Sequence, residues 1–333
     1  MTNIGVKILG LGMHVPETVV TNDDLATFLD TSDEWITTRT GIKERRVIKK
    51  GEDSVTLGIE AAKKAIENAK IDVNEIDAII CATSCPKHLY PSTACEIQKA
   101  LNIKNAFGYD ITAACTGFIY ALDIAQAYIQ SGKYKNILIV ATDANTRFTD
   151  WKDRSVCVLF GDGAGAMVLG KSSDESNDIL GVNVKSDGNI GHYITLPLNG
   201  EECPIVEHDE KTPQHITMLG KDVYKFVVST IPQFIVDTIE DNGLKADDID
   251  YLVPHQANIR IIEAMQSRLN YDDNKVIVNI QHYGNTSAAS VPIALYEGIK
   301  EGKIKTPSKL ILCAFGAGMT WGAAIINLDK GVC

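Results

Sequence analysis

Residues 67–81, ENAKIDVNEIDAIIC, align without gaps on residues 240–254, EDNGLKADDIDYLVP, at an offset of 173 positions. Both segments begin with a glutamate, share an isoleucine–aspartate pair, and end in an apolar run that is typical of a strand. The same offset superimposes two further pairs of segments, namely 121–122 on 294–295 and 137–140 on 310–313. Three matches in one order at a single offset predict that the chain consists of two related halves.

Strand-like and helix-like segments alternate around the first copy of this repeat. Apolar runs typical of strands cover 77–83, 106–112 and 136–142, and amphipathic stretches typical of helices cover 93–101 and 117–129. This alternation predicts an α/β fold. Because the strands are apolar at nearly every position, we expect the sheet to be covered on both faces.

A polar, serine-rich stretch, KSSDESND at 171–178, separates two apolar runs in the middle of the chain. Such a change in composition is typical of a connection between folded units. We therefore predict an N-terminal half over 1–175 and a C-terminal half over 176–333, packed about a pseudo-two-fold axis.

The bulk composition argues against several classes of protein. With 333 residues and 45% hydrophobic content, the chain can bury a large core. A net charge of −11 argues against a general nucleic-acid binder. Charges or glycines interrupt every apolar run before the roughly 20 residues that a membrane helix needs. The segment 1–15 lacks the long apolar core of a signal peptide, so we expect it to form the first strand.

Eight cysteines are scattered along the chain, and several of them lie inside apolar runs. This distribution favours reduced thiols in a cytoplasmic protein over a disulfide framework. No second cysteine pair and no histidine pair completes a zinc-binding pattern, so we expect no metal site.

Cys115 is the candidate nucleophile. It lies in YDITAACTGFIYALD (109–123), where a predicted strand runs into a turn of small residues and then a helix. The first N–H groups of a helix favour a thiolate, so we expect the pKa of this thiol to lie below its usual value. The alternative is an unreactive cysteine buried in the core, which is the commoner role of a free cysteine.

Two polar residues of the second half occupy similar transitions. His255 follows the strand-like YLV (251–253), and Asn285 follows a segment that is predicted to be a strand, KVIVNI at 275–280. Taken singly, the histidine could only pack and the asparagine could only cap a helix. If a pseudo-two-fold axis relates the halves, however, both residues are expected to meet Cys115 in one cleft.

Five motifs are spread along the chain, namely ACTGF (114–118), FGDGAGA (160–166), PHQANIRII (254–262), GNTSAAS (284–290) and FGAGMTWG (315–322). In their order and spacing they resemble those of the β-ketoacyl-acyl carrier protein synthase III family, which consists of condensing enzymes with the thiolase fold. The resemblance covers nearly the whole chain and implies two duplicated α/β halves in five layers, α-β-α-β-α, with pseudo-two-fold symmetry, and a homodimer.

The resemblance implies a reaction that initiates fatty acid biosynthesis. Cys115 would take the acyl group of an acyl-CoA, acetyl-CoA by default, and malonyl-acyl carrier protein would then lose carbon dioxide. His255 and Asn285 would stabilise the resulting enolate, which attacks the acyl-enzyme. Backbone N–H groups of Cys115 and Ala317 would form the oxyanion hole, although the family commonly has glycine at the position of Ala317. CoA and the carrier's phosphopantetheine are substrates, and no cofactor is implied.

The segment TSDEWITTRTGI (31–42) predicts a short helix with Ser32 as its N-cap and Gly41 as its stop. Trp35 and Arg39 would share one face of that helix. From the residues alone, a tryptophan packed on the core beside a solvated arginine explains this pair. The family resemblance implies instead a CoA site.

In that CoA site, Trp35 and Arg154 would hold the adenine between them, and Arg39 would approach the phosphates. Asn258 and Arg260 would line the pantetheine tunnel and its mouth.

A basic rim is implied for the contact with the acidic carrier protein, and it would consist of Lys225, Arg260 and Arg268. Two residues depart from the family pattern at this surface. Lys221 stands where some members have an asparagine that contacts CoA, and Ser267 replaces a basic residue.

Two further sequence features concern the acyl pocket and the glycine-rich motif. Tyr90 corresponds to an aromatic residue that would cross the dimer and close the partner's acyl pocket, whose depth the sequence leaves open. The FGDGAGA motif matches neither phosphate-binding pattern, so we expect its glycines to serve close strand packing.

Two other functions fit the same residue types. A condensing enzyme of specialised metabolism would share the fold and the three polar residues. A cysteine hydrolase of the Cys-His-Asn kind would release the acyl group to water and would need no malonyl substrate.

Overall fold

The computed structural model describes residues 4–174, 176–200, 202–206 and 210–333. Two mixed sheets form its frame. The first has the order β1-β7-β6-β4-β5, with β1 (Val6–His14), β7 (Asp162–Lys171), β6 (Asn136–Ala144), β4 (Ala78–Ala82) and β5 (Phe107–Ile111). The second has the order β11-β12-β13-β8, with β11 (Tyr251–Pro254), β12 (Ser308–Gly316), β13 (Thr320–Leu328) and β8 (Ile179–Ser186).

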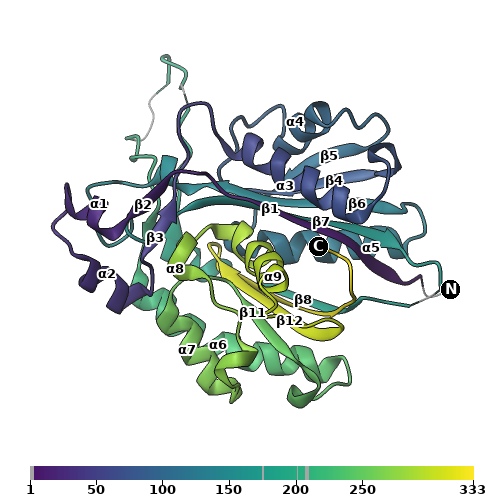
Figure 1. The fold of residues 1–333 in the computed structure, drawn as a ribbon. Coiled ribbons are helices and arrows are strands. Elements are labelled where there is room, and N and C mark those ends of the chain that lie inside the picture. Colours follow the sequence, from purple (N-terminus) through teal and green to yellow (C-terminus); the bar gives the residue numbers. More distant parts are fainter. Residues whose placement is uncertain (1–3, 175, 201, 207–209) are drawn as a thin grey trace.

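Helices fill three layers around these sheets (Figure 1). Outside the first sheet lie α3 (Ser54–Ala69) and α4 (Thr93–Ala100), and outside the second lie α6 (Gly220–Asp241) and α7 (Ile259–Leu269). Between the sheets lie α5 (Gly117–Gln130) and α9 (Ser290–Lys300), which are therefore apolar around most of their surface. This is the expected five-layered α/β arrangement.

The remaining α-helices and strands are short. They are β2 (Val19–Thr21), α1 (Asn22–Ala26), α2 (Asp33–Thr40), β3 (Glu44–Arg46), β9 (Ile194–Thr195), β10 (Thr217–Met218) and α8 (Ile280–Tyr283). Among the described residues, no helix combines the length and the apolar character that crossing a membrane requires.

The predicted repeat extends to the details of the backbone. Strand β8 begins 173 residues after β1, and helix α9 begins 173 residues after α5. The 3₁₀ turn at 114–116 maps in the same way onto the turn at 287–289. Both turns contain a non-glycine residue with positive φ, Ala114 at 45° and Ser287 at 54°. The duplicated halves expected from the sequence are therefore present, down to a strained turn before each central helix.

The strands of the first sheet come from 6–171 and those of the second from 179–328. Helix α9 nevertheless packs against β1 and β7 of the first sheet. The predicted division at 175/176 stays a prediction, and residue 175 lies outside the described residues.

The expected strand at 275–280 is wrong. Only Val276 pairs with a strand, through an isolated bridge to Leu252. The N–H groups of Asn279 and Ile280 bond to a side chain and not to a neighbouring strand. They donate to Oε1 of Gln256 at 3.0 and 3.2 Å. A buried amide thus replaces the partner strand in a segment whose apolar residues suit either structure.

The glycines of FGDGAGA do serve close packing. A Cβ atom at Gly163 would lie 2.9 Å from Ile293, and one at Gly165 would lie 2.6 Å from Pro292. Both neighbours belong to α9, so the two glycines of β7 let the central helix approach the first sheet.

Candidate active site

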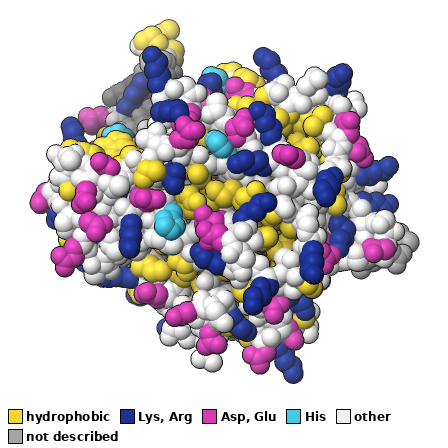
Figure 2. All heavy atoms as spheres, viewed as in Figure 1, with side chains coloured by type: hydrophobic (Ala, Val, Ile, Leu, Met, Phe, Trp, Pro, Cys, Tyr) yellow, Lys and Arg dark blue, Asp and Glu magenta, His cyan; other side chains and the backbone are white. Residues whose placement is uncertain are grey.

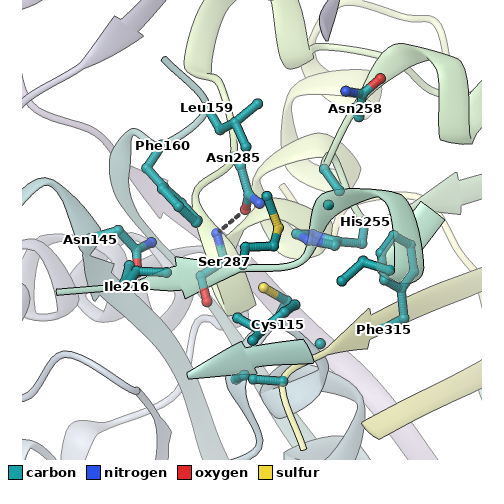
Figure 3. A pocket seen from close by; sticks show the side chains of 18 of the residues that line it. Cys115, Asn145, Leu159, Phe160, Ile216, His255, Asn258, Asn285, Ser287 and Phe315 are labelled. Atoms are coloured by element: carbon teal, nitrogen blue, oxygen red, sulfur yellow. Dashed lines mark hydrogen bonds between the residues drawn. The ribbon is translucent and has the colours of Figure 1, made fainter. Parts of the chain in front are cut away.

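One cavity of about 700 Å³ receives residues from both halves of the chain. Cys115, His255 and Asn285 line it (Figure 3). Ala317 lines it too. Trp35, Arg39 and Asn258 line it as well. The structure therefore brings together the three polar residues singled out in the sequence, which are separated by up to 170 positions. Among the other candidates, Tyr90, Arg154, Lys225, Arg260 and Arg268 lie outside its lining.

Cys115 lies in the 3₁₀ turn that leads into α5, with the end of β12 directly behind it. A Cβ atom at Gly316 would lie 2.7 Å from the backbone nitrogen of Cys115 and 3.2 Å from the Cβ atom of Ala114. Ala317 follows immediately and lines the cavity. This close approach of two backbones is what an oxyanion hole built from the N–H groups of residues 115 and 317 requires.

Gly316→Ala is expected to lower the turnover of condensation by about 10²- to 10³-fold, because the new methyl group displaces a donor of the oxyanion hole. Gly188→Ala is the matched control, since a Cβ atom there meets nothing within 4 Å. Steady-state kinetics of both variants, together with their thermal melting curves, provide the measurement. A Gly316→Ala enzyme with more than half of the original turnover would show that the oxyanion hole is not formed here.

The thiol of Cys115 is half-buried, and this burial raises its pKa to about 12. A hydrogen bond with the Ser287 side chain and its own backbone N–H act in the opposite direction. The expected lowering of this pKa is wrong, because loss of water outweighs the helix N-terminus. The thiol is thus protonated at neutral pH.

His255 follows β11 and is 1% exposed. Its backbone N–H donates to the carbonyl of Cys313 at 2.8 Å, and its Nδ1 lies 2.6 Å from the hydroxyl of Ser290. Burial lowers the pKa of His255 to about 3, so the ring is neutral at neutral pH. Because Nδ1 is occupied by the hydroxyl, Nε2 is the ring nitrogen left for a ligand in the cavity.

Asn285 is held by three backbone contacts. Its N–H donates to the carbonyl of Leu159 at 2.8 Å, and its carbonyl accepts the N–H of Gly161 at 3.1 Å. Its Oδ1 accepts the N–H of Ser287 at 2.8 Å (Figure 3). The side-chain oxygen thus braces the turn before α9, but Asn285 is not the helix N-cap that the sequence suggested, because Thr286 and Ala289 occupy the N-cap positions of this turn and of α9. The amide N–H₂ group remains as the donor for the cavity.

A buried carboxyl group that the sequence analysis missed joins the two halves behind the nucleophile. Asp143 is fully buried and accepts the N–H groups of Ser84 at 2.8 Å and of Ala288 at 3.3 Å. The hydroxyl of Thr83 donates to it at 3.1 Å. Burial raises the pKa of Asp143, although these hydrogen bonds oppose the shift. No local pattern marks this aspartate, because its partners are far away in the sequence.

Ser290 was missed for the same reason, since it meets His255 only in the folded chain. A signal was available in this case. Ser290 is the last residue of GNTSAAS, and a run of hydroxyl side chains next to a candidate catalytic asparagine suggests hydrogen-bond partners for it.

The cavity mouth carries the aromatic and basic residues expected to bind CoA. Ser32 caps α2 and Gly41 ends it at φ 78°, as predicted. The guanidinium carbons of Arg39 and Arg154 lie 4.5 and 5.2 Å from the ring centre of Trp35. Trp35 also packs against a hydrophobic cluster. The tryptophan therefore has the packing role that the residues alone suggested and also lines the cavity.

Comparisons with known proteins identify the family of this chain. The family description 3-oxoacyl-[acyl-carrier-protein] synthase III matches residues 109–188, and its C-terminal counterpart matches residues 239–328. A Clostridium perfringens protein named β-ketoacyl-[acyl-carrier-protein] synthase III is 47% identical over 97% of this chain and 99% of its own. The chain belongs to this family. The predicted enzyme class, a condensing acyltransferase of fatty acid biosynthesis, is thereby confirmed.

Solved structures confirm the thiolase-like fold. The crystal structure of 3-oxoacyl-[acyl-carrier-protein] synthase III from Aquifex aeolicus is 45% identical, covers 97% of this chain and 100% of its own, and gives a TM-score of 0.90. The priming β-ketosynthase from the R1128 polyketide biosynthetic pathway is 33% identical, covers 98% of this chain and 97% of its own, and gives a TM-score of 0.91. A specialised relative thus shares the whole fold.

Proposed function

We propose that the chain condenses an acyl-CoA primer, acetyl-CoA by default, with malonyl-acyl carrier protein, and so initiates fatty acid biosynthesis in the cytoplasm. The products are β-ketoacyl-acyl carrier protein, CoA and carbon dioxide. The observation that carries the proposal is the single cavity in which a thiol, a neutral imidazole and an amide donor meet. No cofactor takes part, because CoA and phosphopantetheine are substrates.

In the first half-reaction, the sulfur of Cys115 attacks the thioester carbon of acyl-CoA. The carbonyl oxygen gains negative charge, which the N–H groups of Cys115 and Ala317 stabilise. The bond between this carbon and the sulfur of CoA then breaks, and CoA leaves with the proton of the thiol. The acyl group is now a thioester of Cys115.

In the second half-reaction, the malonyl thioester loses carbon dioxide, and the electron pair of the broken bond forms an enolate. His255 donates from Nε2 and Asn285 donates from its amide to the enolate oxygen. Donation from Nε2 requires that Nδ1 accept the proton of the Ser290 hydroxyl, which lies 2.6 Å away. The enolate carbon attacks the acyl carbon, the bond to the sulfur of Cys115 breaks with its electron pair on the sulfur, and this thiolate takes a proton from water.

The mouth of the cavity suits a CoA nucleotide. Two guanidinium groups already lie near the ring of Trp35, so an adenine can replace one of them on its face. Arg154 is tied to the carboxylate of Asp30 at 3.2 Å, and Arg260 donates to the carbonyl of Thr38 at 3.0 Å. Asn258 caps α7 and lines the tunnel.

The contact with the carrier protein is proposed on α6 and α7. Lys221 and Lys225 are exposed on α6, and Arg260 and Arg268 are exposed on α7, which packs beside it. On the face shown in Figure 2, basic and acidic side chains alternate. A local cluster of cations near the cavity mouth is therefore needed to attract an acidic partner to a chain of net charge −11.

We also propose the homodimer. Strand β5 is an edge of the first sheet in the chain, and its first residue, Phe107, is a 38% exposed aromatic side chain. Tyr90 is 87% exposed and lies outside the cavity of its own chain. A second copy that pairs with β5 would cover this edge and would give Tyr90 a pocket to close.

Intact-protein mass spectrometry tests the proposal. The enzyme is incubated with acetyl-CoA and a short series of acyl-CoAs, then with malonyl-acyl carrier protein, beside Cys115→Ser. We expect an acyl adduct on Cys115 that disappears as β-ketoacyl carrier forms. An adduct that only hydrolyses would favour the cysteine hydrolase. Condensation confined to an unusual primer would favour a specialised pathway like that of the polyketide relative.

A further inference from the structure

The part of the cavity beside the nucleophile contains an unpaired hydrogen-bond donor. Asn145 begins the 3₁₀ turn that follows β6, is 3% exposed and lines the cavity. Its amide nitrogen Nδ2 has no hydrogen-bond partner among the described residues. Figure 3 shows this side chain at the cavity wall near Ile216 and Phe160, on the side opposite Phe315.

The orientation of this amide is fixed by a neighbouring thiol. Cys85 donates from Sγ to Oδ1 of Asn145 at 3.3 Å. Because the oxygen is occupied by this donor, the N–H₂ group is the end that remains for the cavity. Thr149, one turn later, donates from its hydroxyl to the backbone carbonyl of Asn145 at 3.0 Å and so holds the turn that presents it.

The unpaired donor and the reacting sulfur belong to one cavity. Cys85, whose thiol bonds to Asn145, lines the cavity together with Cys115. Ser84, the residue before it, also lines the cavity, and its hydroxyl is a second buried polar atom without a partner among the described residues. An acyl chain on Cys115 that extends along the wall lined by Cys85 would meet Asn145.

The rest of this wall is apolar, with Leu159, Phe160 and Ile216. An alkyl chain in this space would keep the amide of Asn145 out of water without giving it a partner. Leaving a buried donor unpaired is unfavourable, whereas an oxygen in the chain would pair with it.

We infer that Asn145 makes the acyl pocket selective for primers that carry a hydrogen-bond acceptor in the chain, such as an ether, keto or hydroxyl oxygen, over alkyl primers of the same length. The inference rests on the proposed function, in which Cys115 takes the primer, and extends it to the class of primer. The hydroxyl of Ser84 is the second group that such an oxygen can meet.

The test uses pairs of acyl-CoAs that differ only by an oxygen in place of one methylene. The pairs are methoxyacetyl and butanoyl, 3-methoxypropanoyl and pentanoyl, and 4-methoxybutanoyl and hexanoyl. The two members of a pair compete for the full-length enzyme, and mass spectrometry gives the ratio of the two adducts on Cys115. We expect the ether to be preferred about tenfold in at least one pair.

Asn145→Leu replaces the amide by an apolar group of similar size and is expected to reverse the preference, to about tenfold for the alkyl primer. Ser84→Ala is expected to weaken the preference without reversing it. Because each ratio is measured within one enzyme, the amount of folded protein cancels. If Asn145→Leu does not fold, Asn145→Ala replaces it.

The inference is overturned if the alkyl primer wins in all three pairs with the original enzyme. It is also overturned if the Asn145 variant keeps the original ratio, as it would if the amide only held a water molecule. Failure of the proposed function has a different signature, since Cys115 would then form no adduct with any primer, acetyl-CoA included.

Discussion

Cys115→Ala is expected to abolish condensation and to leave the decarboxylation of malonyl-acyl carrier protein intact. The variant has no sulfur to carry the primer, so the rate of condensation should fall by a factor on the order of 10⁶, as when other enzymes lose their covalent nucleophile. The enolate donors come from the other half of the chain. Nδ1 of His255 is held by Ser290, and Oδ1 of Asn285 is held by the N–H of Ser287.

Two products separate the half-reactions in this experiment. Release of CoA reports acylation, and acetyl-acyl carrier protein reports decarboxylation without condensation. Cys95→Ala is the control, because this half-buried thiol on α4 lies outside the cavity lining and its Sγ bonds only weakly to the carbonyl of Gly108 at 3.6 Å. Parallel loss of both activities in Cys115→Ala would mean that the thiol, and not the second half, organises the decarboxylation site.

The parts of the structure that were predicted from the sequence depend on local patterns. The caps of α2 at Ser32 and Gly41 require only the residues beside them. The strands and helices between 77 and 142 were predicted to within two residues, because their apolar periodicity is strong. The repeat then placed Cys115, His255 and Asn285 in one cleft, since two related halves bring equivalent turns together.

The errors concern groups whose environment is set by distant residues. The backbone of 275–280 looked like a strand, but the side chain of Gln256 takes its hydrogen bonds. The pKa of Cys115 depends on how much water the second half excludes, which no local pattern encodes. The amide of Asn145 is unpaired only because its other end meets Cys85, 60 positions earlier. A sequence pattern predicts where a side chain lies more readily than what surrounds it.

His255→Ala is expected to keep acylation and to lose decarboxylation, which is the opposite of the result expected for Cys115→Ala. Acylation of Cys115 should persist, because its oxyanion hole consists of backbone N–H groups from residues 115 and 317. Decarboxylation should fall by about 10²- to 10³-fold, the usual effect of removing one donor from a developing negative charge. If the rate of decarboxylation fell by less than about threefold, Asn285 and not His255 would be the main donor to the enolate oxygen.

The protonation state of His255 gives a sharper test, made in the Cys115→Ala background so that the thiol does not titrate. Burial lowers the pKa of His255 to about 3, below its ordinary value near 6.5, so the ring stays neutral at every pH above about 4. The rate of decarboxylation should therefore show no inflection from His255 between pH 5 and 8. A rate that falls as the pH rises through about 6.5, and that no longer does so in His255→Ala, would show that the ring is open to water and that a charged imidazolium, not a neutral donor held by Ser290, faces the enolate.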